Sequence, residues 1–177
     1  MENAKLGDCT KIISGFAFSA SDFNKSESGL KIIRIQNVGK DSSREFVYWH
    51  KEYKEKFLIK NGDLLLSLSG SFRAEIWSQG ESLLNQRIVK IIPKSNIHLN
   101  WFFHWLNNKL SLIERMGKHA LVNNVGITDL KEMKISIPTL DEQKRIAAIL
   151  DKANDIEETT EKSNEITAIP KLLEVLS

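Results

Sequence analysis

Three consecutive polar residues, Asn85, Gln86 and Arg87, interrupt the apolar run "LLNQRIVKIIP" at residues 83–93. Asn, Gln and Arg are the side chains that make paired hydrogen bonds to the edges of adenine and guanine. Because the triplet adjoins a β-rich run, it could present these groups to a nucleic acid. The first chemistry that the sequence indicates is therefore polar recognition.

A second interpretation of the same triplet is structural. The apolar residues on both sides of it indicate partial burial, and this favours Asn85 and Gln86 as hydrogen-bond partners of a neighbouring loop. The stretch "GDLLLSLSG" at residues 62–70 reads as a buried strand that enters such a loop. Ser69 lies in it, so we expect Ser69, Asn85 and Gln86 to support each other and to hold the loop in shape for a ligand.

Signatures of catalysis are missing or weak in the sequence. It has no P-loop, no dinucleotide-binding G-x-G-x-x-G and no G-x-S-x-G nucleophile turn. The run Glu52-Tyr53-Lys54 with Asp41 upstream matches a nuclease cluster only loosely. Cys9 is the single cysteine, and the four histidines show no ligand spacing: His50, His98, His104 and His119. We therefore expect neither an enzyme nor a metal site.

Charge is distributed unevenly along the 177 residues, although the net charge is only +2. Residues 141–177 carry 9 acidic and 5 basic side chains, whereas residues 1–140 carry 20 basic and 14 acidic ones. A basic globular part with an acidic tail fits a polyanion-binding domain joined to a separate interaction element. An ordinary solvated surface would account for the same charges.

The elements expected before residue 97 are short strands that form a compact mixed or antiparallel sheet. "KIIRIQNV", "FVYWH", "FLI", "LLLSL" and "RIVKII" are β-rich, and "KNGD" predicts a turn in which Asn61 and Gly62 tolerate positive φ. Over residues 100–118 the apolar residues recur with the period of an α-helix. Asn100 is expected to cap the start of this helix and Gly117 its end. Its apolar stripe and aromatic residues predict core packing rather than a base-stacking platform: Trp101, Phe102, Phe103, Trp105, Leu106, Leu110 and Ile113.

A long C-terminal helix is predicted after a short helical turn at residues 128–133 and a strand that ends at Pro138. Thr139 and Glu142 form a capping box at its start, and Pro170 should kink or end it. One face of this helix carries an apolar seam: Ile146, Ile149, Leu150, Ala153, Ile156, Ile166, Ile169 and Leu173. The seam packs either on the chain's own domain or on another chain, and the length and acidity of the helix favour the second.

These elements predict an α+β fold: a β-rich domain with packed helices over residues 1–138 and a long helix over residues 139–177. No apolar run is long enough to cross a membrane, and the N-terminus "MENAKLGDCTK" has no signal pattern. We therefore expect a cytoplasmic protein without a membrane partner.

The order of five segments resembles a known family. "GFAF", "IIRIQNV", "GDLLLSLSG", "LLNQRIVKIIP" and "ISIPTLDEQKRIAAILD" follow one another as in a target recognition domain and conserved helical region of the specificity subunit of type I restriction-modification enzymes. The resemblance covers residues 6–151. It implies a non-catalytic subunit that reads double-stranded DNA, with two recognition domains and two antiparallel helices in a full-length chain. This sequence has one of each and resembles a half-subunit.

Partners follow from the resemblance. It implies methyltransferase subunits that bring S-adenosylmethionine, and a restriction subunit that uses ATP and Mg²⁺, with no cofactor on this chain. We expect a homodimer through the long helix, which by symmetry would read two inverted copies of one half-site. The alternative is an interaction module, a truncated or regulatory half-subunit without productive DNA reading. The basic part supplies the candidate DNA contacts: Lys31, Arg34, Lys40, Arg44, Arg73, Arg87 and Lys118.

Overall fold

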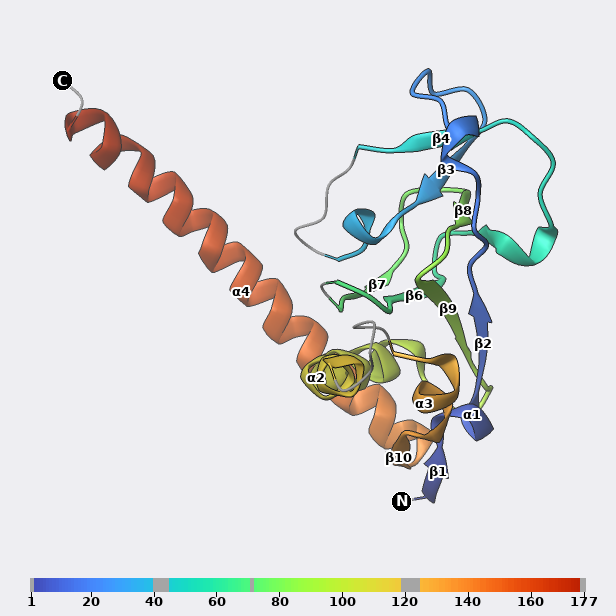
Figure 1. Cartoon of the computed structure of the whole chain (residues 1–177). Coiled ribbons are helices and arrows are strands. Elements are labelled where there is room, and N and C mark those ends of the chain that lie inside the picture. Colours follow the sequence, from blue (N-terminus) through green and yellow to red (C-terminus); the bar gives the residue numbers. More distant parts are fainter. Residues whose placement is uncertain (1, 40–44, 71, 119–124, 176–177) are drawn as a thin grey trace.

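A β-rich domain and a long projecting helix make up the molecule, which we describe from a computed structural model (Figure 1). The structure describes residues 2–39, 45–70, 72–118 and 125–175, except for the side chains of Lys118, Glu158 and residues 161–175. The strands are β1 (Glu2–Lys5), β2 (Thr10–Ser14), β3 (Leu30–Ile33), β4 (Val47–Trp49), β5 (Leu58–Ile59), β6 (Leu64–Ser67), β7 (Ala74–Ile76), β8 (Ser82–Leu84), β9 (Ile88–Pro93) and β10 (Lys134–Ile137). The α-helices are α1 (Leu6–Cys9), α2 (Leu99–Lys118), α3 (Ile127–Glu132) and α4 (Leu140–Val175), and short 3-10 helices cover Ala20–Asp22, Ile35–Asn37 and Glu55–Phe57.

Three sheets contain the described strands. One is antiparallel with the order β2-β9-β6-β7, and one is mixed with the order β4-β3-β8-β5, in which β3 and β8 run parallel. β1 and β10 form a third, two-stranded sheet that joins the two ends of the domain. The α+β class and the mixed and antiparallel pairing are confirmed, whereas β1 was not expected from the sequence.

One predicted strand is wrong in its extent, whereas the turn predicted at "KNGD" is confirmed. β3 ends at Ile33, and the chain then turns through the 3-10 helix Ile35–Asn37, so "KIIRIQNV" is not one continuous strand. The turn "KNGD" joins β5 to β6, which lie in different sheets, and of its two central residues only Gly62 has positive φ, at +91°. The local patterns were recognised, but the connections depend on long-range pairing.

Helix α2 covers the antiparallel sheet and supplies much of the larger core. Trp101, Phe102, Leu106 and Ile113 are buried against residues of that sheet, which confirms the core-packing interpretation of the aromatic run. The helix begins at Leu99 and ends at Lys118, so Asn100 is its second residue rather than its cap. The side chain of Asn100 is used elsewhere, because it donates a hydrogen bond to Asp151 on α4.

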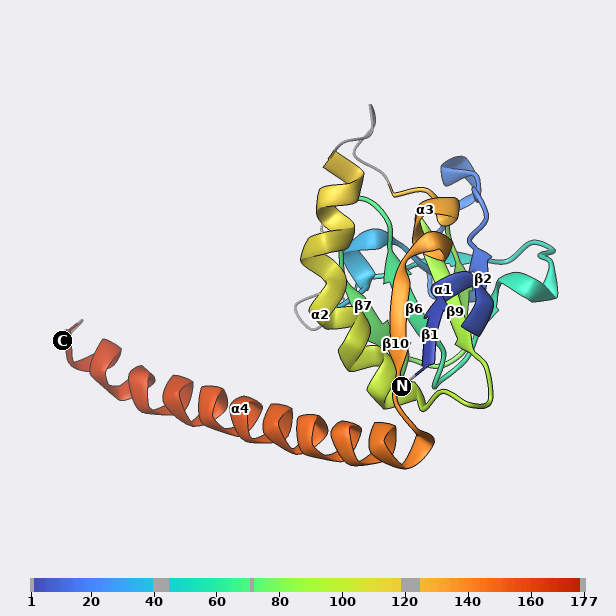
Figure 2. The ribbon, with the colours of Figure 1, turned by 90° about the horizontal axis from the view of Figure 1, so that it is seen from below.

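Helix α4 starts as the capping box predicts. The backbone N–H of Thr139 donates to the Glu142 carboxylate at 3.0 Å, and the backbone N–H of Glu142 donates to the Thr139 hydroxyl at 3.4 Å. The helix continues through Pro170 to Val175, so of the two expectations for Pro170, a kink or an end, the end is wrong. Figures 1 and 2 show α4 passing beside α2 and then extending away from the domain.

Candidate nucleic-acid interface

The loop between β6 and β7, at the end of "GDLLLSLSG", is a meeting point for three other segments. Its first residue after β6, Leu68, donates its backbone N–H to the carbonyl of Arg87 at 2.8 Å and accepts from the N–H of Val125 at 3.4 Å. Ser67 closes the loop, because its hydroxyl accepts a hydrogen bond from the N–H of Arg73 at 2.9 Å. These hydrogen bonds hold both ends of the loop, at Ser67 and Leu68 and at Arg73, and bring the main chains of Arg73 and Arg87 close to one another.

The segment after β3 joins this group through Asn37, which is fully buried. The side-chain oxygen of Asn37 accepts from the N–H of Arg34 at 2.9 Å, and its Nδ2 donates to the carbonyl of Glu45 at 2.9 Å. Gly39 follows, with a φ of +105°, and a Cβ at this position would lie 2.7 Å from Cδ of Arg73. The stem of Arg73 thus packs directly on the backbone after β3, a contact that only glycine allows.

Three of the predicted DNA contacts, Arg34, Arg73 and Arg87, therefore lie on neighbouring loops. Among the described residues, the guanidinium groups of Arg73 and Arg87 have neither an ion pair nor a hydrogen bond, which leaves them available to a ligand. Arg34 is partly engaged: its guanidinium donates to the carbonyl of Glu45 at 3.5 Å, and to Gln36 when the amide oxygen of Gln36 is turned toward it. The arrangement is an arginine-bearing surface with a rigid backbone.

Arg87 has a feature that the sequence does not reveal. Its φ is +69°, in the left-handed region, and its side chain is exposed. This conformation costs a residue with a Cβ roughly 1 kcal/mol, and such strain is concentrated at functional positions. The backbone hydrogen bonds of Gln86 to Phe16 and of Leu68 to Arg87 hold the turn on both sides.

The remaining basic candidates lie elsewhere or outside the described residues. The Lys31 ammonium donates to the carbonyl of Gln79 at 3.1 Å and lies 5.1 Å from the centre of the Phe46 ring, so it is held by the domain itself. Lys118 is the last residue of α2, and its side chain is not among those described. Lys40 and Arg44 also fall outside the described residues.

Asn85 lies at a close approach between two backbones. A Cβ on Gly15 would lie 1.9 Å from the Asn85 carbonyl oxygen, so only glycine fits there. The side-chain oxygen of Asn85 is buried without a hydrogen-bond partner, and the side chain of Gln86 is exposed. Within the described part of the chain, no side-chain hydrogen bond joins either residue to Ser69. The loop is supported instead by Ser67 and by the main chain of Arg87.

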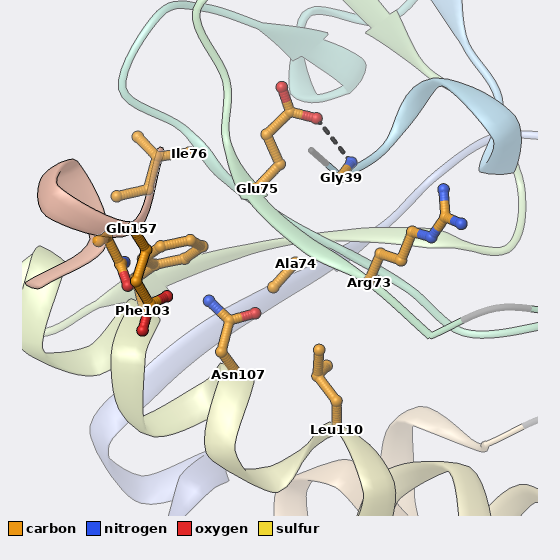
Figure 3. Close-up of a pocket in the computed structure, with 10 residues that line it drawn as sticks. Gly39, Arg73, Ala74, Glu75, Ile76, Phe103, Asn107, Leu110 and Glu157 are labelled. Carbon is orange, nitrogen blue, oxygen red and sulfur yellow. Dashed lines mark hydrogen bonds between the residues drawn. The ribbon is translucent and has the colours of Figure 1, made fainter. Parts of the chain in front are cut away.

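A cleft of about 530 Å³ lies where β7, α2 and α4 meet, next to this arginine surface. Figure 3 shows Phe103 and Asn107 from α2 and Glu157 from α4 around it, with Arg73 at one side. Glu75 accepts a hydrogen bond from the N–H of Gly39 at 2.9 Å, which ties β7 to the segment after β3. The loops that carry Arg34, Arg73 and Arg87 and the long helix α4 are thus parts of one connected structure.

The apolar seam of α4 is exposed in its described part. Ile149 is 67% exposed and Ile156 58%, and Ile146, Leu150 and Ala153 are exposed as well. The face that packs on the domain is a different one, with Gln143 and Ala147 fully buried. The seam therefore does not fold back on its own domain as far as Ile156. Ile166, Ile169 and Leu173 lie within α4, but their side chains are outside the described set.

The described residues contain neither a metal-binding cluster nor a helix suited to crossing a membrane. No group of three or more His, Cys, Asp or Glu side chains in this part of the chain is arranged to hold a metal ion. None of the helices described there combines the length and the apolar character that crossing a membrane requires.

Solved structures with the same fold define the class. The chain superposes with a TM-score of 0.78 on a chain from a study of complex assembly and conformational transition of the type I R-M system, at 20% identity, over 94% of this chain and 41% of the other. It superposes with a TM-score of 0.70 on the HsdS subunit from Thermoanaerobacter tengcongensis, at 20% identity, over 87% of this chain and 37% of that one. The fold that this chain shares with 41% and 37% of these two chains is thus a β-rich domain that carries a long projecting helix.

The sequence places the chain in a family. Residues 1–168 match the model of the type I restriction modification DNA specificity domain, and the chain belongs to this family. It is 32% identical over 147 residues to the specificity subunit of the type I restriction enzyme EcoBI from Escherichia coli, which is 82% of this chain and 31% of that protein. It is 25% identical to the MjaVIII specificity subunit from Methanocaldococcus jannaschii, over 93% of this chain and 38% of that protein. The chain thus spans about a third of the length of these relatives.

Proposed function

We propose that this chain is a non-catalytic component that gives a type I restriction-modification system its DNA sequence specificity, and that it reads one half of a bipartite target. The observation that carries the proposal is the convergence of Arg34, Arg73 and Arg87 on the loop after β6. Family membership and the similarity to type I specificity subunits support it.

The chemistry expected of this arginine surface is recognition of duplex DNA. Arginine binds phosphate oxygens through charge-assisted hydrogen bonds and guanine through its O6 and N7 atoms. Arg73 and Arg87 have guanidinium groups without partners among the described residues, on loops that are already fixed by hydrogen bonds. Main chain that is already hydrogen-bonded in the free protein lowers the entropic cost of binding, because less of it has to be ordered on DNA.

A homodimer would supply the second half of the target. The seam formed by Ile146, Ile149, Leu150, Ala153 and Ile156 is exposed on a helix that projects from the domain, where a second copy of α4 can reach it. A two-fold symmetric pair presents two identical recognition surfaces, and these read inverted copies of one half-site.

The catalytic steps and cofactors belong, in this proposal, to other subunits. Methyltransferase subunits would bring S-adenosylmethionine, and a restriction subunit would bring the chemistry that depends on ATP and Mg²⁺. The relatives named above are themselves specificity subunits of type I restriction enzymes. This chain would determine where on the DNA those partners act.

The test uses the chain co-expressed with the methyltransferase of its own system. Genomic DNA of a host without other methylation is sequenced for modified adenines, and binding to the motif so found is measured by fluorescence anisotropy. R73E/R87E should weaken binding at least tenfold, because two cations become anions at the interface. K134E changes an exposed lysine on β10 and serves as the matched control. Unchanged binding by R73E/R87E would leave an interaction module without DNA reading as the better description.

A further inference from the structure

One stripe of α4 attaches the helix to the domain through polar groups. Gln143, Ala147 and Asp151 follow one another at intervals of four residues, so they lie on one face of the helix. Gln143 is 0% exposed and Ala147 1%. The small side chain of Ala147 lets α4 approach α2 closely between two hydrogen-bonding residues.

Gln143 uses its whole amide group in this attachment. Its Oε1 accepts a hydrogen bond from the backbone N–H of His98 at 2.7 Å. Its Nε2 donates to the carbonyl oxygens of Asn96 at 3.0 Å and Pro138 at 2.9 Å. The side chain thus connects the first turn of α4 to the end of β10 and to the segment that leads into α2.

Asp151 makes the second attachment, two turns further along the helix. Its two carboxylate oxygens bind two residues of α2: Oδ2 accepts from Nδ2 of Asn100 at 2.9 Å, and Oδ1 lies 2.6 Å from Nε2 of His104. The hydrogen bond from Asn100, and then that from His104, hold the pKa of Asp151 below its ordinary value. The carboxylate is therefore ionised at neutral pH and has both partners in place.

Two attachments fix a direction, which one alone would not. Gln143 and Asp151 are separated by about 12 Å along the axis, at 1.5 Å per residue, and α4 continues about 36 Å beyond Asp151 to Val175. A tilt of about 10° at the attachment would then move the far end by about 6 Å, which approaches two base-pair steps of about 3.4 Å.

The polar character of this face fits an angular role. Hydrogen bonds weaken steeply when their geometry is distorted, whereas apolar contacts tolerate sliding and rotation. An attachment made of Leu and Ile would bind α4 as firmly but would fix its direction less strictly. The exposed side chains of Ile146, Ile149, Leu150 and Ile156 lie instead on the neighbouring seam.

We propose that the clamp formed by Gln143, Asp151, Asn100 and His104 sets the direction of α4 relative to the recognition loops, and thereby the spacing between the two half-sites. This inference rests on the proposed function, since it assumes a dimer that reads a bipartite target. Asn100 and His104 are positioning residues, and they do not contact DNA in this proposal.

The experiment compares N100A/H104A with D155A in the complex with the methyltransferase. Asp155 is exposed one turn beyond the clamp and is the matched control. The half-site sequences in the methylated motif should stay the same for both variants. The spacer should remain a single length with D155A and extend to neighbouring lengths with N100A/H104A, with at least tenfold more methylation at a spacer altered by one base pair. H104Q, made with Asn100 unchanged, keeps an N–H donor at position 104. This variant should keep the single spacer length.

A second measurement distinguishes a failure of the clamp inference from a failure of the proposed function. Spin labels at Ser78 and Thr160, both exposed, report the angle between the domain and α4 within one chain. We expect a narrow distance distribution that broadens in N100A/H104A. An unchanged distribution, or a broadened one with an unchanged spacer, would overturn the inference and leave the proposed function intact. Absence of a bipartite motif with the unmodified chain would overturn both.

Discussion

Replacement of Arg87 by glycine should separate DNA binding from folding stability. Arg87 has a φ of +69°, a conformation in which a residue with a Cβ is less stable than glycine by about 1 kcal/mol. Part of this gain is offset because glycine has a more flexible unfolded chain, by about 0.5–1 kcal/mol. The net gain is about 0–0.5 kcal/mol, so we expect R87G to unfold at the same temperature as the unmodified chain, or up to about 2 °C higher.

DNA binding should change in the opposite sense. If Arg87 contacts a base through both of its terminal nitrogens, its loss costs about 1–3 kcal/mol, and the affinity falls roughly 5-fold to 150-fold. R87A is the matched control, because it also lacks the guanidinium but keeps the strained backbone. The two variants should bind DNA equally weakly, whereas R87A should be less stable than R87G. The assays are thermal unfolding of the isolated chain and anisotropy with duplex DNA at fixed salt, in the complex with the methyltransferase.

Two results would refute this reasoning. If R87G were destabilised by more than about 1 kcal/mol relative to R87A, the left-handed conformation would not be the source of strain. If both variants bound DNA like the unmodified chain, Arg87 would lie outside the interface. The affinity could instead fall by the same factor for all DNA sequences, with the slope of log affinity against log salt concentration reduced by about 1. That result would mean that Arg87 contacts a DNA phosphate rather than a base.

Three further predictions concern the dimer, the loop after β3 and the attachment of α4. I149E/I156E should have the monomer mass of 20.2 kDa by light scattering, because each isoleucine buried in the dimer contributes about 2 kcal/mol. At the same concentrations the unmodified chain and the control K152E should have twice that mass. A dimeric I149E/I156E would exclude this interface. N37A should lower the free energy of unfolding by about 2 kcal/mol, because it removes two hydrogen bonds between a buried side chain and the backbone of Arg34 and Glu45, at about 1 kcal/mol each. It should also raise hydrogen exchange in the segment after β3, and unchanged exchange would contradict the role of Asn37. Because the pKa of Asp151 is lowered on folding, its stabilising contribution is present above the ordinary value of 3.8 and lost as the pH falls through the lower folded value. The spin-label distance should therefore broaden in acid in the unmodified chain, and D151N should remove this pH dependence.

Local patterns in the sequence were sufficient for the elements that depend on neighbouring residues. The capping box of Thr139 and Glu142 places the start of α4, and the apolar stripe from Phe102 to Ile113 places α2 on the core. Periodicity and capping depend on residues three or four positions apart, so a single sequence contains them. The local rule for Pro170 allowed a kink or an end, and the helix does not end there.

Contacts between distant segments were not predictable in this way. Asn37 reads as an ordinary polar residue in a β-rich run, yet its side chain holds the segment after β3 through backbone groups that its sequence does not specify. No local pattern marks Gln143 and Asp151, because their partners other than Pro138 lie 45 to 51 residues away in the chain. The sequence did contain one usable signal, since Asn100 and His104 are spaced four apart on a helix otherwise rich in apolar residues.

The seam and the clamp divide α4 between two tasks with different physical requirements. A contact within one chain forms at a fixed effective concentration, so it can use directional hydrogen bonds whose net contribution to stability is small. A contact between two chains must also offset the entropy lost on association, for which burial of apolar surface is the larger source of free energy. The apolar side chains accordingly lie on the exposed face that would meet a second chain, at Ile149 and Ile156. The hydrogen-bonding side chain of Gln143 lies on the buried face that meets its own domain. Exchanging the two kinds of face, with apolar side chains at the clamp and amides on the seam, should give a chain that folds but remains a monomer of 20.2 kDa by light scattering.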